Sequence, residues 1–295
     1  MTSSEDGLSY EDGRLDLSDG RTLAWRWWGE PDWAPVLRLQ GTPGSRLIRH
    51  PKPSIQQGLR VRYLMADRPG FGGSTRLPGR SIAQFADDLV ELLDHHGIGQ
   101  LPVMGTSGGG PHALAIAARH PERVKAVSVI VGASHLEPDE ASRQVGVNAA
   151  GYVAAGRGWE ALNSLLVEVR ERLLGQEGMA GVLADAPATD RAIMEDPAWK
   201  RINRGNVAEA LRQGSEGWTD ESMAIHGAWG FDLAAVQGGV TWWHGDDDKN
   251  APLSAARRAT AELRKVDLRV WHQEGHFASL THDQEIVREL LSRSA

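Results

Sequence analysis

The sequence predicts an α/β fold, in which a mostly parallel sheet is flanked by helices and a helical cap is inserted after the sixth strand. Two observations favour this class. Short apolar runs alternate with segments of helical periodicity over residues 14–132 and again over residues 240–292. Between residues 135 and 235 only helical patterns occur. Strict alternation indicates parallel strands, because each parallel pair needs a crossover connection, usually a helix.

The elements of the first part follow from local signals. Six apolar runs bounded by turn residues predict strands over residues 14–17, 22–28, 36–40, 60–66, 101–105 and 124–132. The first two form a hairpin that turns at Ser18, Asp19 and Gly20. A weak helical pattern covers residues 47–57, a firmer one lies between Ser81 and Gly97, and a third covers residues 110–120.

After the cap the alternation resumes. Strands are expected over residues 240–244 and 268–272, and helices over residues 253–264 and 277–292. We therefore divide the chain into a core domain of residues 1–134 and 236–295 and a cap, or lid, of residues 135–235. Such a cap would cover the carboxyl edge of the sheet, where open α/β folds bind ligands.

Composition excludes several classes of function. The 295 residues carry a net charge of −7 and include no cysteine, so disulfides, thiol catalysis and Cys-based metal sites are absent. An acidic chain without basic clusters is not expected to bind nucleic acid. No apolar run approaches the roughly 18 residues of a membrane span, and the polar start is unlike a signal peptide. We expect a soluble, cytoplasmic protein with no membrane partner; the sequence leaves open whether it is a homodimer.

A candidate nucleophile lies between a predicted strand and a predicted helix. Residues 105–109 match the pattern G-x-S-x-G, with Ser107 at its centre. Strand, sharp turn and helix together form a nucleophile elbow, which exposes the serine Oγ in a strained backbone conformation. A glycine-rich loop that binds phosphate or only turns the chain is the alternative. The context favours the elbow.

A serine hydroxyl needs a base and an orienting acid, and on this scaffold the chain order is Ser, acid, His. His276 is the favoured base, because it follows Gly275 in a loop before a helix, whereas His272 lies in a strand pattern and His282 in a helical one. The candidate acids share one loop and are Asp246, Asp247 and Asp248. A metal site on His244, Asp246 and Asp248 is a weaker alternative, since no second ligand cluster supports it.

Four segments together resemble the α/β-hydrolase superfamily. They are residues 41–46, residues 67–74, the elbow at Ser107, and Gly275 with His276. The resemblance covers residues 14–130 and 240–291 and points to capped serine hydrolases of the esterase-like and proline-iminopeptidase-like branch.

The resemblance implies roles for further residues. In the family pattern the catalytic acid is the last residue of G-x-x-D, a few positions before a proline. Gly245 to Asp248, followed by Pro252, fits this pattern and selects Asp248 as the acid, with Asp246 as the second choice. The oxyanion hole would use the backbone N–H groups of Gly108 and Thr42. Gln40 stands where the family usually has a histidine, and a glutamine amide can form some of the hydrogen bonds with which that imidazole would brace the loop. Arg46 and Arg68 are expected to hold loops through carboxylate or carbonyl contacts. No metal or organic cofactor is implied.

We therefore expect a serine hydrolase that cleaves an ester, lactone, thioester or related acyl bond through an acyl-enzyme. The alternatives are an aminopeptidase or a C–C bond hydrolase on the same triad, and a non-catalytic ligand-binding protein on the same fold. An aminopeptidase would need acidic cap residues, for which Glu137, Glu140, Glu160 and Glu168 are available. Dehalogenases and epoxide hydrolases are disfavoured, because they need a carboxylate nucleophile.

The partner is expected to be an apolar, small-molecule acyl substrate. Of the 11 tryptophans, four lie between Trp159 and Trp229 in the proposed cap. Besides packing on the core, these side chains suit contact with an apolar group. We expect Gln40 and Trp229 to contact the substrate.

Overall fold

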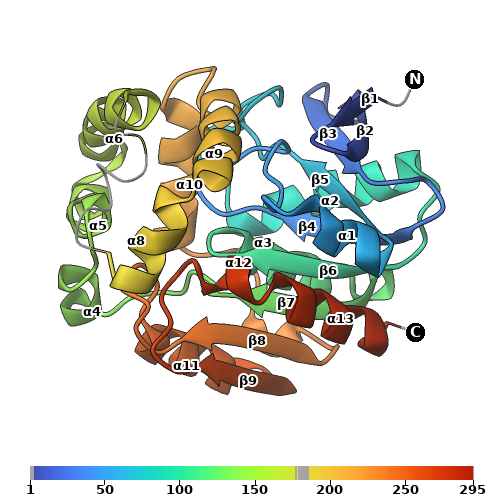
Figure 1. The fold of residues 1–295 in the computed structure, drawn as a ribbon. Coiled ribbons are helices and arrows are strands. Elements are labelled where there is room, and N and C mark those ends of the chain that lie inside the picture. Colours follow the sequence, from blue (N-terminus) through green and yellow to red (C-terminus); the bar gives the residue numbers. More distant parts are fainter. Residues whose placement is uncertain (1–2, 177, 179–185, 295) are drawn as a thin grey trace.

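Among the described residues, nine strands pair in a single sheet of order β1-β2-β3-β5-β4-β6-β7-β8-β9 (Figure 1). The computed structural model describes residues 3–176, 178 and 186–294. The first three strands and β5 pair antiparallel, whereas all pairs from β5 through β4 to β9 are parallel. The mostly parallel sheet predicted from the sequence is confirmed. The strands are β1 (Ser3–Glu5), β2 (Leu8–Asp16), β3 (Thr22–Trp28), β4 (Ala34–Leu39), β5 (Val61–Ala66), β6 (Leu101–Thr106), β7 (Val124–Ile130), β8 (Val240–Gly245) and β9 (Val266–Trp271).

Side-chain alternation along the strands gives the sheet two buried faces. Val103 and Trp242 belong to the apolar cluster on one face, and their neighbours Met104 and Trp243 belong to the cluster on the other. Helices α2, α3 and α11 complete the first cluster, and α1 and α13 the second. The core helices are α1 (Pro53–Leu59), α2 (Ile82–His95), α3 (Gly109–Arg119), η1 (Pro121–Arg123), α11 (Leu253–Glu262), α12 (Ala278–Thr281) and α13 (Asp283–Arg293). The short helix η2 (Leu233–Ala235), at the end of the segment between β7 and β8, places Leu233 in the first cluster.

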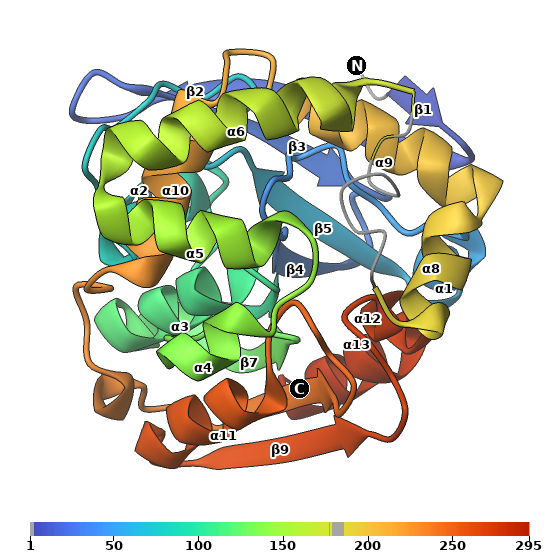
Figure 2. The ribbon, with the colours of Figure 1, turned by 90° about the vertical axis from the view of Figure 1, so that its left-hand side faces the viewer.

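The described residues between β7 and β8 form helices and no strand, and we call residues 135–235 the cap segment. The cap helices before η2 are α4 (Pro138–Ser142), α5 (Val147–Arg157), α6 (Trp159–Leu174), α8 (Ala188–Glu195), α9 (Pro197–Ala210) and α10 (Glu216–His226). They gather on one side of the sheet (Figure 1). In Figure 2, which looks from that side, α5 and α6 lie in front of the sheet. The segment has its own apolar cluster, which includes Leu162, Leu166, Trp199 and Trp218.

Three elements differ from the sequence-based expectation. The short strand β1 was not predicted, so the cap segment follows β7, which is the sixth of the predicted strands. The helix expected over residues 47–57 is instead α1, which starts at Pro53; proline is accepted in the first turn of a helix but not in its interior. The last helix is divided into α12 and α13. The second begins at Asp283, whose buried carboxylate accepts a hydrogen bond from Arg38 at 2.8 Å.

No helix in the described ranges is long and apolar enough to cross a membrane.

Candidate active site

Ser107 occupies a strained turn between β6 and α3. Its φ is +53°, a left-handed conformation that non-glycine residues rarely adopt. The turn is held by backbone bonds, since Ser107 N–H donates to Ile130 O at 2.9 Å and its carbonyl accepts from Gly110 N–H at 2.8 Å. A Cβ on Gly105 would overlap the carbonyl oxygen of Gly109, so a glycine is required there. The local fold of these residues therefore matches the predicted elbow.

His276 bridges Ser107 and Asp248. Its Nε2 lies 3.0 Å from Ser107 Oγ, and its Nδ1 lies 2.7 Å from Asp248 Oδ2. The other carboxylate oxygen, Asp248 Oδ1, accepts the N–H groups of Asn250 and Ala251 at 2.8 Å each. These three side chains come from three loops that follow β6, β8 and β9, at the carboxyl edge of the sheet.

The electrostatics of this chain of contacts follow from burial and pairing. Burial opposes ionisation of Asp248, yet the facing His276 holds the pKa of the carboxyl below its ordinary value. Burial also disfavours the imidazolium, but Asp248 raises the pKa of His276 above its ordinary value. The geometry thus favours an ionised acid next to an imidazole that readily accepts a proton.

The other two carboxylates of the β8–α11 loop have separate partners. Asp246 Oδ2 lies 2.7 Å from His272 Nδ1, and Asp247 pairs with Lys249 at 2.6 Å. His272 was expected inside a strand, but it follows β9 and its side chain is 83% exposed. Only Asp248, of the three, contacts His276.

His244 lies beneath this loop. Its Nε2 is 2.7 Å from Ala251 O and 3.6 Å from Asp248 Oδ2. Within the described ranges, no three His, Asp or Glu side chains are grouped as metal ligands.

The loop after β4 passes directly over the elbow. The Cβ position of Gly41 is 3.4 Å from Ser107 Cβ, and a Cβ on Gly108 would overlap Thr42 Oγ1. Thr42 and Gly108, the residues predicted to supply the oxyanion hole, therefore lie against each other beside Ser107.

Gln40 and Arg68 hold this loop from behind. Gln40 Nε2 donates to Ala66 O at 2.9 Å, so the amide anchors the loop to β5 where the family usually has an imidazole. Arg68 donates to the carbonyl oxygens of Gln40 and Gly41, the latter at 2.8 Å, and to Thr42 Oγ1 at 2.9 Å. The expectation that Arg68 holds a loop through carbonyl contacts is confirmed.

A buried ion cluster connects the same loop to the cap segment. Glu221 on α10 forms ion pairs with Arg68, at 2.9 Å from its Nε, and with Arg80, and it lies 3.1 Å from His112 Nε2. All four side chains are buried. Burial opposes ionisation of Glu221, but the two guanidinium groups hold its pKa well below the ordinary value. Removing one member would leave an uncompensated buried charge, which typically costs about 3–5 kcal/mol.

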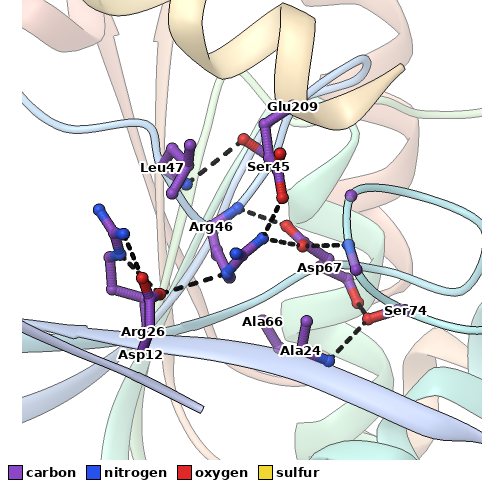
Figure 3. Close-up of polar contacts among 12 residues, drawn as sticks. Asp12, Ala24, Arg26, Ser45, Arg46, Leu47, Ala66, Asp67, Ser74 and Glu209 are labelled. Carbon is purple, nitrogen blue, oxygen red and sulfur yellow. Dashed lines mark hydrogen bonds and ion pairs between the residues drawn. The ribbon is translucent and has the colours of Figure 1, made fainter. Parts of the chain in front are cut away.

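A second cluster fixes the loop at Arg46 (Figure 3). The fully buried Asp67 accepts the N–H groups of Arg46 at 2.7 Å and Gly73 at 2.9 Å, and it pairs with the Arg46 guanidinium. The same guanidinium reaches Glu209 on α9 at 2.6 Å. Figure 3 also shows Ser74 bonded to the Asp67 carbonyl. The expected loop-holding role of Arg46 is confirmed.

Gly72→Ala is expected to destabilise the protein by about 3 kcal/mol or more. Gly72 has φ +48°, and an added Cβ would overlap the carboxylate of Asp67. The left-handed backbone costs an alanine about 1–2 kcal/mol, and overpacking adds about 1–3 kcal/mol. Urea unfolding monitored by tryptophan fluorescence measures the change.

Gly79→Ala is the matched control, because Gly79 has φ +68° but no atom within 4 Å of its Cβ position. Its free energy of unfolding should fall only by the cost of the left-handed backbone. Equal losses in the two variants would contradict the role assigned to the Asp67 contact.

A cavity of about 300 Å³ opens above Ser107 and His276. Its walls are mainly apolar and include Leu162, Leu166, Trp199, Trp218, Ile225 and Phe277. Amide side chains interrupt them, among them Gln40, Gln144, Asn148, Asn203 and Asn250. No Asp or Glu is among the described lining residues.

The cap tryptophans that face the cavity are not the one predicted to contact the substrate. Trp229 is not among the residues that line the cavity; it is buried in the core cluster, where its Nε1 donates to Ile225 O at 2.9 Å. It lies where the chain returns to the sheet, and its carbonyl accepts Ala83 N–H at the start of α2. The structure therefore contradicts the predicted substrate contact of Trp229, because its side chain packs in the core and not in the cavity. Trp199 and Trp218 line the cavity instead. Gln40 lines it too, and its contact with the substrate stays a prediction.

Sequence reasoning did not single out several residues that support the site. These are Arg80, His112, Asp190 and Glu221. Each meets its partners only through the tertiary fold, and no local motif marks it.

The chain belongs to the α/β hydrolase fold family, whose model matches residues 34–283. It is 27% identical over 282 residues to the dihydrolipoyllysine-residue acetyltransferase component of the acetoin cleaving system of Pseudomonas putida, with 92% of this chain and 66% of that protein covered. The chain thus spans about two thirds of the length of that relative. It is 25% identical over 265 residues to 2-hydroxymuconate semialdehyde hydrolase of Pseudomonas putida, covering 86% of this chain and 84% of that protein. The fold also resembles the enol-lactonase of Burkholderia xenovorans LB400, with a TM-score of 0.68, 18% identity, and 95% and 100% of the two chains covered.

Proposed function

We propose that the protein is a serine hydrolase that cleaves an ester or lactone bond of an apolar acyl substrate. The observation that carries this proposal is the position of His276, within hydrogen-bond distance of both Ser107 Oγ and Asp248. Nucleophile, base and orienting acid in this order are what acyl transfer through a serine requires.

The proposed reaction has two halves. Ser107 Oγ attacks the carbonyl carbon while its proton moves to His276 Nε2, and the tetrahedral intermediate collapses as the imidazolium returns that proton to the leaving alkoxide. A water molecule then attacks the acyl-enzyme, with His276 again taking the proton. The C–O bond to Ser107 breaks as the imidazolium returns that proton to Ser107 Oγ, which releases the acid and restores the free serine. Asp248 keeps Nδ1 protonated and stabilises the imidazolium in both halves.

The N–H groups of Gly108 and Thr42 would bind the oxyanion, and each such donor is worth about 2.7–4 kcal/mol. Arg68 supports this role, because it donates to the carbonyl of Gly41 at 2.8 Å. That carbonyl shares a peptide group with the Thr42 N–H, so the bond polarises the donor that faces the oxyanion.

The cavity walls favour an apolar acyl substrate over an aminoacyl one. An aminopeptidase must hold a substrate ammonium, and a carboxylate is the natural partner for it. The glutamates that the sequence offered for this role, Glu137, Glu140, Glu160 and Glu168, are not among the lining residues. Glu140 is bonded to Arg258 on α11 instead.

A C–C bond hydrolase on the same triad is the second candidate. The likeness to 2-hydroxymuconate semialdehyde hydrolase over 86% of the chain favours it. Turnover of p-nitrophenyl esters of graded acyl length, compared with turnover of an enol-keto acid, separates the two candidates.

A fluorophosphonate probe is expected to form one covalent adduct, on Ser107, because only an activated serine reacts with it. Mass spectrometry of the digested protein locates the adduct. Ser107→Ala should abolish labelling and ester turnover. Ser222→Ala, which alters another serine that lines the cavity, should leave both intact. An unlabelled wild-type protein would indicate a non-catalytic ligand-binding protein and refute the proposal.

A further inference from the structure

A second carboxylate approaches His276 from the cap segment. Asp190 lies in the first turn of α8 and is completely buried. Its Oδ2 accepts the backbone N–H of His276 at 2.9 Å, and its Oδ1 accepts the N–H of Phe277, also at 2.9 Å. One residue of the cap segment therefore binds two consecutive backbone N–H groups, those of His276 and Phe277, in the loop after β9.

Gly275 makes this contact sterically feasible. A Cβ at position 275 would overlap both carboxylate oxygens of Asp190. A glycine is therefore required before His276, because any side chain at position 275 would occupy the space of the Asp190 carboxylate.

The charge of Asp190 is not neutralised by a cation of its own. Across the described part of the chain, no Arg or Lys forms an ion pair with it, and burial raises the pKa of its carboxyl while the two N–H donors and His276 oppose that rise. A neutral side chain with two acceptor oxygens could also bind these N–H groups, so they do not by themselves explain a charged residue here. A buried carboxylate is costly unless a positive charge compensates it. The imidazole of His276 can compensate it when protonated, and Asp190 acts together with Asp248 to raise the pKa of that imidazole.

We propose that Asp190 is a positioning residue, which fixes the backbone of His276 and adds a second negative charge that stabilises the imidazolium formed during catalysis. This inference rests on the proposed serine-hydrolase function. It implies that the active site is complete only when α8 of the cap segment is docked on the loop after β9.

Asp190→Asn tests the charge, because asparagine keeps the shape and one acceptor. The groups that face His276 are Asp248 from the β8–α11 loop and Asp190 from α8, with His244 of β8 behind Asp248. The acid limb of kcat/KM reports the titration of His276 in the free enzyme. Loss of a negative charge destabilises the imidazolium, so the pKa of His276 falls and activity persists to lower pH. We expect the limb to move down by about half a pH unit or more, and kcat for p-nitrophenyl acetate at pH 8 to fall about tenfold.

Glu195→Gln is the matched control, since it removes a charge from an exposed position of the same helix. It should leave the limb and kcat unchanged. If Asp190→Asn does not fold, Gly275→Ala displaces the carboxylate instead, and the same downward shift is expected.

Different results would refute the proposed hydrolase function and the role of Asp190. If wild-type Ser107 is not labelled by the fluorophosphonate, the proposed function fails. If it is labelled, but Asp190→Asn lowers only the melting temperature and leaves the acid limb in place, the role of Asp190 is overturned.

Discussion

Replacement of His276 by alanine is expected to lower kcat for a p-nitrophenyl ester by about 10⁶-fold. Without the imidazole, Ser107 Oγ has no base at 3.0 Å to take its proton, and the leaving group has no acid. The oxyanion hole and the cavity would remain, so KM should change little. Steady-state kinetics with active-site titration of the wild-type protein measure the loss.

His272→Ala provides the matched control. His272 also contacts an aspartate, Asp246 at 2.7 Å, but its side chain is 83% exposed and lies outside the cavity. Its replacement should change kcat less than twofold. Similar losses in the two variants would mean that His276 is not the base.

Asp248→Asn is expected to lower kcat by about 10⁴-fold, which is the loss that the same change causes in other serine hydrolases. Asp248 Oδ1 accepts two backbone N–H groups, so the oxygen of an asparagine would stay in that position. Its NH₂ group would then face His276 Nδ1 and force the proton onto Nε2. The base would hold the wrong tautomer at the nitrogen that must accept the proton of Ser107.

Asp246→Asn is the corresponding control, because Asp246 binds Gln273 N–H and His272 in a similar way. It should leave kcat within about twofold. A large loss there, with little effect at Asp248, would transfer the role of acid to Asp246, the second choice from the sequence.

The parts of the site that could be predicted are those encoded by neighbouring residues. The elbow at Ser107 depends on a strand, two glycines and a helix within one short stretch, and the structure contains all of them. Gly275 and His276 follow a strand in the same manner. Asp248 could be preferred to its neighbours only through the family resemblance, because three adjacent carboxylates carry the same local signal.

The parts that could not be predicted depend on contacts between distant segments. Asp190 is 86 residues from His276, and Glu221 is 109 residues from His112. The composition of the cap segment favoured Trp229 as a substrate contact. Its place in the core depends instead on a contact with a distant helix, since its carbonyl accepts the N–H of Ala83 in α2. Strand β1 was missed because three residues carry too little periodicity to indicate a strand.

The ties between cap and core have a consequence for how this protein can diversify. Glu221 is buried between two arginines of the core, Asn206 binds Ser45 at 2.8 Å, and Asp190 binds the loop that carries the histidine. A cap transplanted from a relative with another specificity would remove all three partners at once and leave Arg68 and Arg80 uncompensated. New specificity is therefore more accessible through substitutions on the cavity-facing sides of α6, α9 and α10 than through exchange of the cap as a module, since cap and core are constrained to change together.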